Sequence, residues 1–182
     1  MKELSLHILD IIHNSIAADA TLIELDLIEN IKDDILKFSI TDNGKGMSAE
    51  TVKRVIDPFT TSRTTRKVGL GIPMLKAAAE LTGGGIDLKS ELGRGTTISA
   101  EFGYSSIDRQ PLGDMAETIL GLITSHEEID FKYHHSVDDR EFDFDTREIK
   151  KVLDGVSFAV PDVMLWLAEF LRENEAALYN KN

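Results

Sequence analysis

The chain has 182 residues, 42% of them hydrophobic, which is enough for one good-sized domain or for a smaller domain with an appendage. Its 32 acidic against 20 basic residues give a formal charge of −12, so we expect no surface for nucleic acid or for an anionic membrane. The absence of cysteine excludes disulfides and thiolate metal sites. Since neither a signal peptide nor an apolar run of ~18 residues occurs, we expect a cytoplasmic protein.

The first hundred residues alternate between helical and extended patterns. Helices are predicted over 3–18, 49–56 and 73–82, and strands over 21–28, 35–41, 86–90 and 96–102. Ser48 is suited to cap the second helix, and Pro73 is suited to the first position of the third. The last two strands form a predicted hairpin around 93–95.

Near residue 104 the character of the chain changes. The pattern then predicts a helix over 112–124, strands over 129–135 and 141–144, and helices over 145–154 and 161–178. His134 and His135 are neighbours in a predicted strand and therefore face opposite sides, so we do not expect them to share a metal. The prediction is a domain over 1–104 and an acidic appendage of unknown role over 105–182.

Asp10 and Asn14 lie four residues apart on the first predicted helix, with roughly 6 Å between their Cβ atoms. The amide oxygen of Asn14 is a suitable ligand for Mg²⁺, which also takes water and phosphate oxygens. The carboxylate of Asp10 is placed to act as a base toward water. A solvated polar helix face would show the same pair.

The segment 42–46, Asp-Asn-Gly-Lys-Gly, follows a predicted strand directly. The carboxylate of Asp42 can accept a hydrogen bond from the exocyclic amine of adenine, where guanine carries a carbonyl. Gly44 and Gly46 allow the backbone to pass close to a flat base. An ordinary turn would explain the same residues.

Gly69, Leu70 and Gly71 stand directly before a predicted helix, whose first N–H groups form a ready anion site. The preceding stretch 60–67 carries three cations, Arg63 among them, and five hydroxyl residues. This basic cluster in an acidic chain fits a lid that closes over phosphates, although a solvated loop has a similar composition. No Walker P-loop pattern occurs.

The segment 93–97, Gly-Arg-Gly-Thr-Thr, is explained by a tight hairpin turn. Thr97 is also placed to direct a hydroxyl group at an adenine pocket. Taken in order, the four motifs contain each contact that an adenine nucleotide needs, so the sequence predicts an ATP site.

In that order the motifs resemble the GHKL superfamily, which comprises gyrase-type, heat-shock-chaperone, histidine-kinase and mismatch-repair ATPases. The likeness covers about 3–103; the segment 14–21 is similar to the mismatch-repair version, and 57–62 and 93–97 to histidine kinases. It implies an α/β fold of the two-layer α+β kind, in which helices cover one face of a Bergerat-type mixed sheet. The pattern after residue 104 adds an α-β-β-α-α appendage to this fold. It also implies binding of ATP and Mg²⁺ through residues already named: Asn14 (Mg²⁺), Asp42, Gly44, Gly46, Arg63, Gly69, Leu70, Gly71 and Thr97.

Hydrolytic members carry glutamate where this chain has Asp10, the candidate catalytic residue. The first motif begins too near residue 1 for an upstream helix pair with a phospho-accepting histidine. We therefore expect a stand-alone kinase domain that transfers the γ-phosphoryl group to a partner protein. The alternatives are an ATP-hydrolysing conformational switch of the mismatch-repair or gyrase type and a non-catalytic module that senses ATP.

Overall fold

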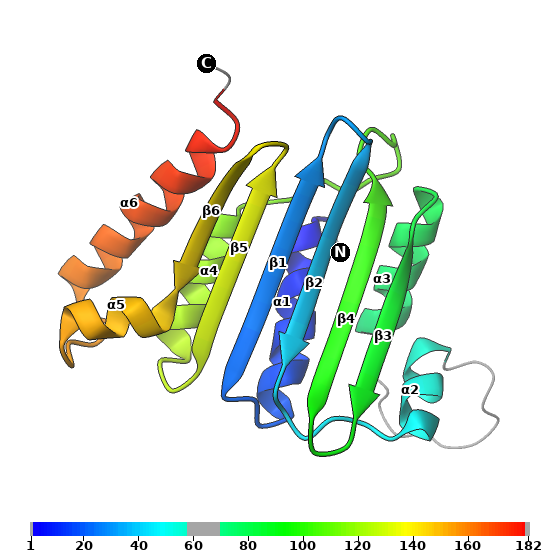
Figure 1. Ribbon diagram of the computed structural model, residues 1–182, viewed down its shortest axis with the longest axis horizontal. Coiled ribbons are helices and arrows are strands. Elements are labelled where there is room, and N and C mark those ends of the chain that lie inside the picture. Colours follow the sequence, from blue (N-terminus) through cyan, green and yellow to red (C-terminus); the bar gives the residue numbers. More distant parts are fainter. Residues whose placement is uncertain (1, 58–69, 181–182) are drawn as a thin grey trace.

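The protein is described by a computed structural model that covers residues 2–57 and 70–180. Its centre is a single six-stranded sheet with the strand order β3-β4-β2-β1-β5-β6 (Figure 1). The strands are β1 (Leu22–Asn30), β2 (Ile35–Asp42), β3 (Gly85–Glu91), β4 (Gly95–Gly103), β5 (Asp130–Val137) and β6 (Arg140–Asp145). All neighbours pair antiparallel except β1 and β5, which are parallel, so the sheet is mixed as predicted.

Helices cover one face of this sheet, with α1, α3 and α4 lying behind it in the view of Figure 1. The helices are α1 (Leu4–Ala17), α2 (Ala49–Ile56), α3 (Gly71–Leu81), α4 (Met115–Ser125), α5 (Thr146–Leu153) and α6 (Pro161–Ala177). Strand residues alternate between this buried layer and a polar face on the other side, which carries Glu24, Asp26 and His134. The predicted α/β fold with helices on one face is confirmed.

The predicted elements of the first hundred residues are all present, with one correction. Ser48 caps α2 as expected, because its hydroxyl accepts a hydrogen bond from the backbone N–H of Thr51. The third helix starts two residues earlier than predicted, at Gly71, so Pro73 is its third residue and not its first. Proline is tolerated there because N–H groups of the first turn have no partner within the helix.

The C-terminal part adds two strands to the same sheet. β5 pairs in parallel with the whole of β1, from Leu22 opposite Asp130 to Glu29 opposite Val137. β6 returns beside β5 after a two-residue turn and forms the end of the sheet. A single sheet therefore runs through both parts of the chain, and the division at residue 104 stays a prediction. In the described residues no helix is long and apolar enough to cross a membrane.

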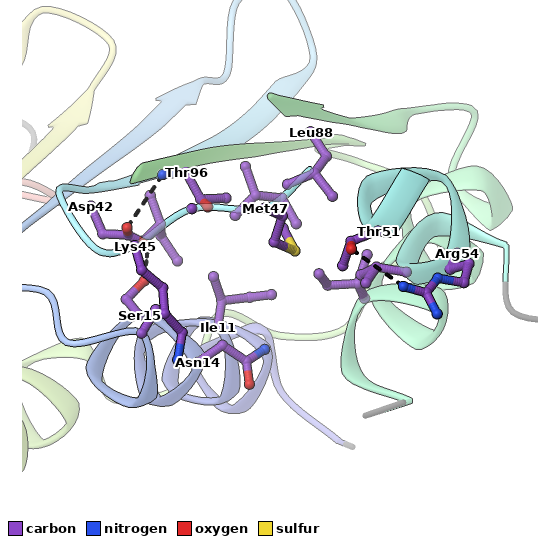
Figure 2. A pocket seen from close by; sticks show the side chains of 16 residues that line it. Ile11, Asn14, Ser15, Asp42, Lys45, Met47, Thr51, Arg54, Leu88 and Thr96 are labelled. Carbon is purple, nitrogen blue, oxygen red and sulfur yellow. Dashed lines mark hydrogen bonds between the residues drawn. The ribbon is translucent and has the colours of Figure 1, made fainter. Parts of the chain in front are cut away.

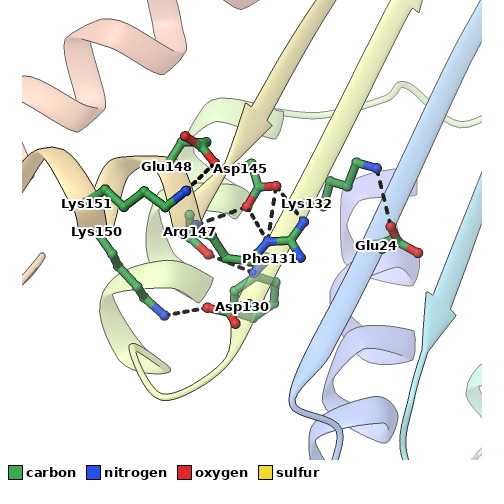
Figure 3. Close-up of polar contacts among 10 residues, drawn as sticks. Glu24, Asp130, Phe131, Lys132, Asp145, Arg147, Glu148, Lys150 and Lys151 are labelled. Atoms are coloured by element: carbon green, nitrogen blue, oxygen red, sulfur yellow. Dashed lines mark hydrogen bonds and ion pairs between the residues drawn. The ribbon is translucent and has the colours of Figure 1, made fainter.

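Polar contacts join α5 to the sheet (Figure 3). Asp145 caps the helix and pairs with Arg147 at 2.7 Å, and hydrogen bonding from that guanidinium lowers the pKa of the Asp145 carboxyl. Lys150 Nζ lies 2.8 Å from Asp130 Oδ1 at the start of β5. The backbone N–H of Phe131 donates to the hydroxyl of Thr146 at 2.9 Å. Lys132, Arg147, Lys150 and Lys151 are therefore each partnered with an acidic residue.

A buried polar cluster joins α6 to the sheet. The ring of His135 is fully buried between two carboxylates, with Nε2 2.9 Å from Glu29 and Nδ1 2.8 Å from Glu175. Tyr133 donates to Glu175 at 2.7 Å, and Tyr179 donates to Glu29. Burial lowers the pKa of His135, but the hydrogen bonds and charges of the two carboxylates outweigh it and raise this pKa to about 9. The cluster is therefore held by a protonated imidazole.

Candidate nucleotide site

A cavity of about 400 Å³ lies between the sheet and α1, α2 and α3 (Figure 2). This volume is within the range of roughly 300–1,000 Å³ typical of small-molecule sites. Eight apolar side chains line it: Ile11, Ala18, Ile40, Met47, Val55, Ile72, Leu88 and Ile98. Seven polar or charged residues complete the lining with Gly46: Asn14, Ser15, Asp42, Lys45, Thr51, Arg54 and Thr96. A flat, largely apolar ring with a polar edge fits such a lining.

Asp42, the last residue of β2, supplies the carboxylate of the cavity and is only 8% exposed. Its Oδ2 accepts a hydrogen bond from Ser15 Oγ at 2.5 Å. Its Oδ1 accepts from the backbone N–H groups of Gly44 at 2.9 Å and Thr96 at 3.3 Å. These three donors fix the orientation of the carboxylate, and Oδ2 retains a lone pair that can accept from an adenine amine.

The turn after Asp42 is held between α1 and the β3–β4 hairpin. The N–H of Lys45 donates to the carbonyl of Ala18, and the carbonyl of Lys45 accepts from Gly93, both at 2.8 Å. Gly46 has φ +68°, and a Cβ there would lie 2.0 Å from the carbonyl oxygen of Glu91. Only glycine fits this position, which explains the second glycine of the motif and its place in the cavity wall.

Asn14 and Asp10 take different positions although they share one face of α1. Asn14 lines the cavity, and within the described residues its side chain makes no hydrogen bond, so its amide oxygen is free to accept a ligand. Asp10 lies outside the lining and packs against Gly71, where a Cβ would be 1.8 Å from Asp10 Oδ2. The candidate base therefore stands at the N-terminus of α3.

That helix begins beside the cavity, with Leu70 as its N-cap and Gly71 as its first residue. Ile72, in the first turn, lines the cavity, so the N–H groups of this turn lie near it. The positive end of a helix dipole favours phosphate oxygens. Arg63, Gly69 and the stretch 60–67 that was predicted to form a lid lie outside the described residues.

The two threonines of the fourth motif lie on opposite faces of β4. Thr96 lines the cavity, and its backbone N–H donates a hydrogen bond to Oδ1 of Asp42. The hydroxyl of Thr97 lies 3.1 Å from that of Thr41, on the polar face of the sheet. The structure therefore places Thr96, and not Thr97, where a hydroxyl could reach a bound base. Successive side chains of a strand point to opposite faces of the sheet, so only one of the two threonines can face the cavity. The sequence did not show which one.

Three further cavity residues were not singled out in the sequence. Ser15 orients Asp42 but is separated from it by 27 positions, so only the fold shows the contact. Lys45 extends from the turn toward α1, as Figure 2 shows, and brings a cation to the polar end of the cavity. Arg54 hydrogen-bonds to Thr51 on α2 at the other end. In the sequence, only their positions close to the recognised motifs could have indicated that these residues belong to the site.

The residues present fit Mg²⁺ bound together with phosphate. Within the described residues no group of three or more acidic or histidine side chains could hold a metal alone. Mg²⁺ keeps several waters and commonly takes one or two protein oxygens together with substrate phosphates. The amide of Asn14, which makes no hydrogen bond to any other described residue, could supply one such oxygen at the cavity.

Comparison with known proteins shows which family shares this arrangement. The model of the "Histidine kinase-, DNA gyrase B-, and HSP90-like ATPase" family matches residues 2–105. The heme sensor protein HssS of Staphylococcus saprophyticus is 35% identical over 96 residues, which cover 51% of this chain and 20% of that protein. The sensor protein SrrB of Staphylococcus aureus is 45% identical over 75 residues, which cover 38% of this chain and 12% of SrrB.

Among solved structures, the N-terminal domain of a DNA repair protein superposes with a TM-score of 0.56 over 99% of this chain and 57% of that one. The sequence identity is 12%, so this likeness concerns the fold alone. The chain covers at most a fifth of the two sensor proteins, and the activities of those whole proteins do not pass to it by similarity. The family match spans more than half of the chain, so the chain belongs to the histidine kinase-, DNA gyrase B- and HSP90-like ATPases.

Proposed function

We propose that the protein is a kinase domain that binds ATP with Mg²⁺ and transfers the γ-phosphoryl group to a partner protein. The observation that carries the proposal is the pairing of Asp42 and Asn14 across one cavity. Asp42 provides the acceptor for the adenine amine, and Asn14 provides the oxygen for Mg²⁺ beside the phosphates. Phosphoryl transfer depends mainly on positioning and on neutralising charge, which these groups and the N-terminus of α3 supply.

Transfer is favoured over hydrolysis by the position of Asp10 and by the relatives. The carboxylate packs against Gly71 and does not line the cavity, so a water inside the cavity is not its natural partner. Beside the first residue of α3 the same carboxylate can orient, or take a proton from, an acceptor group that arrives from outside. Relatives that match this chain in part include proteins named sensor kinase CckA and histidine protein kinase DivJ.

The test is incubation of the protein with γ-labelled ATP, Mg²⁺ and cell extract, followed by separation of free phosphate from labelled protein. The proposal predicts label on a partner and none with Asn14→Ala. Asp26→Asn, on the polar face of the sheet, is the control that keeps the label. If the label appears only as free phosphate, and Asp10→Asn abolishes its release, the result would support the ATP-hydrolysing switch and not the kinase. Tight ATP binding with neither product would support the sensing module.

A further inference from the structure

A second groove, of about 450 Å³, runs along the helix layer between α1 and α4. Leu6 and Leu9 of α1 and Leu122 of α4 form its apolar lining, and Leu6 is 43% exposed. Gly121 of α4 leaves a notch in this groove, because a Cβ there would meet no atom within 4 Å. An apolar channel between two neighbouring helices has the shape that accepts a third helix.

The wall of the groove carries three carboxylates, and the imidazoles of His13 and His126 lie in the same lining. Glu3, Asp114 and Glu117 all line it, and within residues 2–57 and 70–180 none of the three forms an ion pair. Asp114 and Glu117 also stabilise the start of α4, through the cap and the helix dipole, but both remain exposed. The groove therefore complements a helix that carries apolar residues on one side and lysine or arginine beside them.

The groove adjoins the nucleotide site through α1. Leu9 precedes Asp10 directly, and Leu6 lies four residues before Asp10. The leucines that line the groove and the carboxylate of Asp10 therefore lie on neighbouring faces of α1. An α-helix is about 10 Å across, so a segment seated in the groove would lie about one helix width from Asp10 on α1. A protein bound there would be positioned to present an acceptor group.

We infer that the α1–α4 groove binds an amphipathic, basic helix of the protein that receives the phosphoryl group. This inference rests on the proposed kinase function for the role of the partner, but the groove itself is defined independently of the nucleotide site. Charge decides against a second copy of this chain as the occupant, because the chain carries −12 overall and the groove is itself acidic.

Binding is tested with a fluorescein-labelled synthetic helix of 18 leucine and lysine residues, with leucine confined to one face, titrated with the full chain. Gly121→Met fills the notch, and since methionine is a better helix former than glycine the fold is retained. Glu117→Lys reverses one charge of the groove. Glu173→Lys makes the same charge change at an exposed position of α6 and serves as the control.

The inference predicts that Gly121→Met and Glu117→Lys each weaken peptide binding about tenfold or more, while Glu173→Lys changes it about twofold or less. ATP affinity must be the same in all of them. Equal loss with Glu117→Lys and Glu173→Lys, or unchanged binding by Gly121→Met, would overturn the inference. The inference would also be overturned if the wild type formed dimers and Gly121→Met were monomeric, because the groove would then be occupied by a second copy of the chain.

The assay with γ-labelled ATP separates this inference from the proposed function. Partner labelling that is as strong with Gly121→Met as with the wild type would leave the kinase standing and remove the groove as its docking site. Groove-dependent peptide binding without any labelled protein would leave the groove standing as an interaction surface and remove the kinase.

Discussion

The hydroxyl of Ser15 donates a 2.5 Å hydrogen bond to Oδ2 of Asp42, and this contact joins the first helix to the end of β2 inside the nucleotide cavity. Asp42 lines the cavity, and its carboxylate is the proposed acceptor for an adenine amine. The serine is therefore a positioning residue for the carboxylate that the site depends on.

Ser15→Ala is expected to weaken ATP binding about five- to fifty-fold, because a hydrogen bond to a charged group is worth about 1–2 kcal/mol or somewhat more. Titration calorimetry with ATP and Mg²⁺ measures the change. Ser39→Ala removes a hydroxyl that is bonded to Ser99 on the polar face and is the matched control. Equal effects of the two variants would show that the contact has no special role.

Thr96→Val is expected to weaken ATP binding, and Thr97→Val is expected to leave it within about twofold. Thr96 lines the cavity and its hydroxyl lies 2.8 Å from that of Ser90, whereas the hydroxyl of Thr97 lies 3.1 Å from that of Thr41 on the opposite face, so each substitution removes one such contact. The two substitutions are identical in chemistry and adjacent in the chain, so each controls for the other. The reverse order of effects would return the nucleotide contact to Thr97.

Gly71→Ala is expected to displace Asp10, because the added Cβ would lie 1.8 Å from its carboxylate. The clashing atoms are the end of one side chain that can turn aside, so we expect a loss of about 0.5–1.5 kcal/mol of stability, measured by urea unfolding, together with a fall in phosphoryl transfer. In the Asp10→Ala background the same glycine substitution should cost little, since the clashing atoms are gone. Additive effects in this double-mutant cycle would contradict the contact.

The stability of the protein is expected to fall as the pH rises from about 6.5 to 9.5. The folded pKa of His135, about 9, lies above its ordinary value of 6.5, so the contribution is fully present below 6.5 and is lost as the pH passes 9. Its upper limit is about 3 kcal/mol, from a shift of roughly two and a half units at 1.36 kcal/mol each. Urea unfolding of the wild type and His135→Gln at both ends of this range measures it, and a slope that persists in His135→Gln would contradict the assignment.

The sequence predicted most of the fold, and the reason lies in short-range patterns. Amphipathic spacing located the helices, and alternation separated His134 on the polar face from His135 in the core, as the structure confirms. The pairing of β5 with β1 could not be foreseen, because their contacts join residues more than 100 positions apart. The buried Glu29–His135–Glu175 cluster depends on that pairing and was missed for the same reason.

For the site, the motifs placed Asn14, Asp42 and Gly46 at one cavity. The motifs did not distinguish Thr96 from Thr97 and did not reveal the role of Ser15. Both depend on which face of its helix or strand a side chain occupies. The start of α3 was misplaced at Pro73 because proline is commonest at the first helical position, whereas here Leu70 caps the helix. The assignment of Thr97 and the start of α3 both fall next to glycines of the site, whereas the role of Ser15 depends on a contact across 27 positions.

The central claim, that this cavity binds ATP through Asp42, is tested most directly by titrating ATP and Mg²⁺ into the wild type, Asp42→Asn and Asp26→Asn. Asparagine would direct an N–H₂ group at the N–H donors of Gly44 and Thr96 or at the adenine amine, and it removes the charge. We predict that Asp42→Asn lowers ATP affinity about a hundredfold while Asp26→Asn, on the polar face, leaves it unchanged. Equal affinity of Asp42→Asn and the wild type would contradict the account.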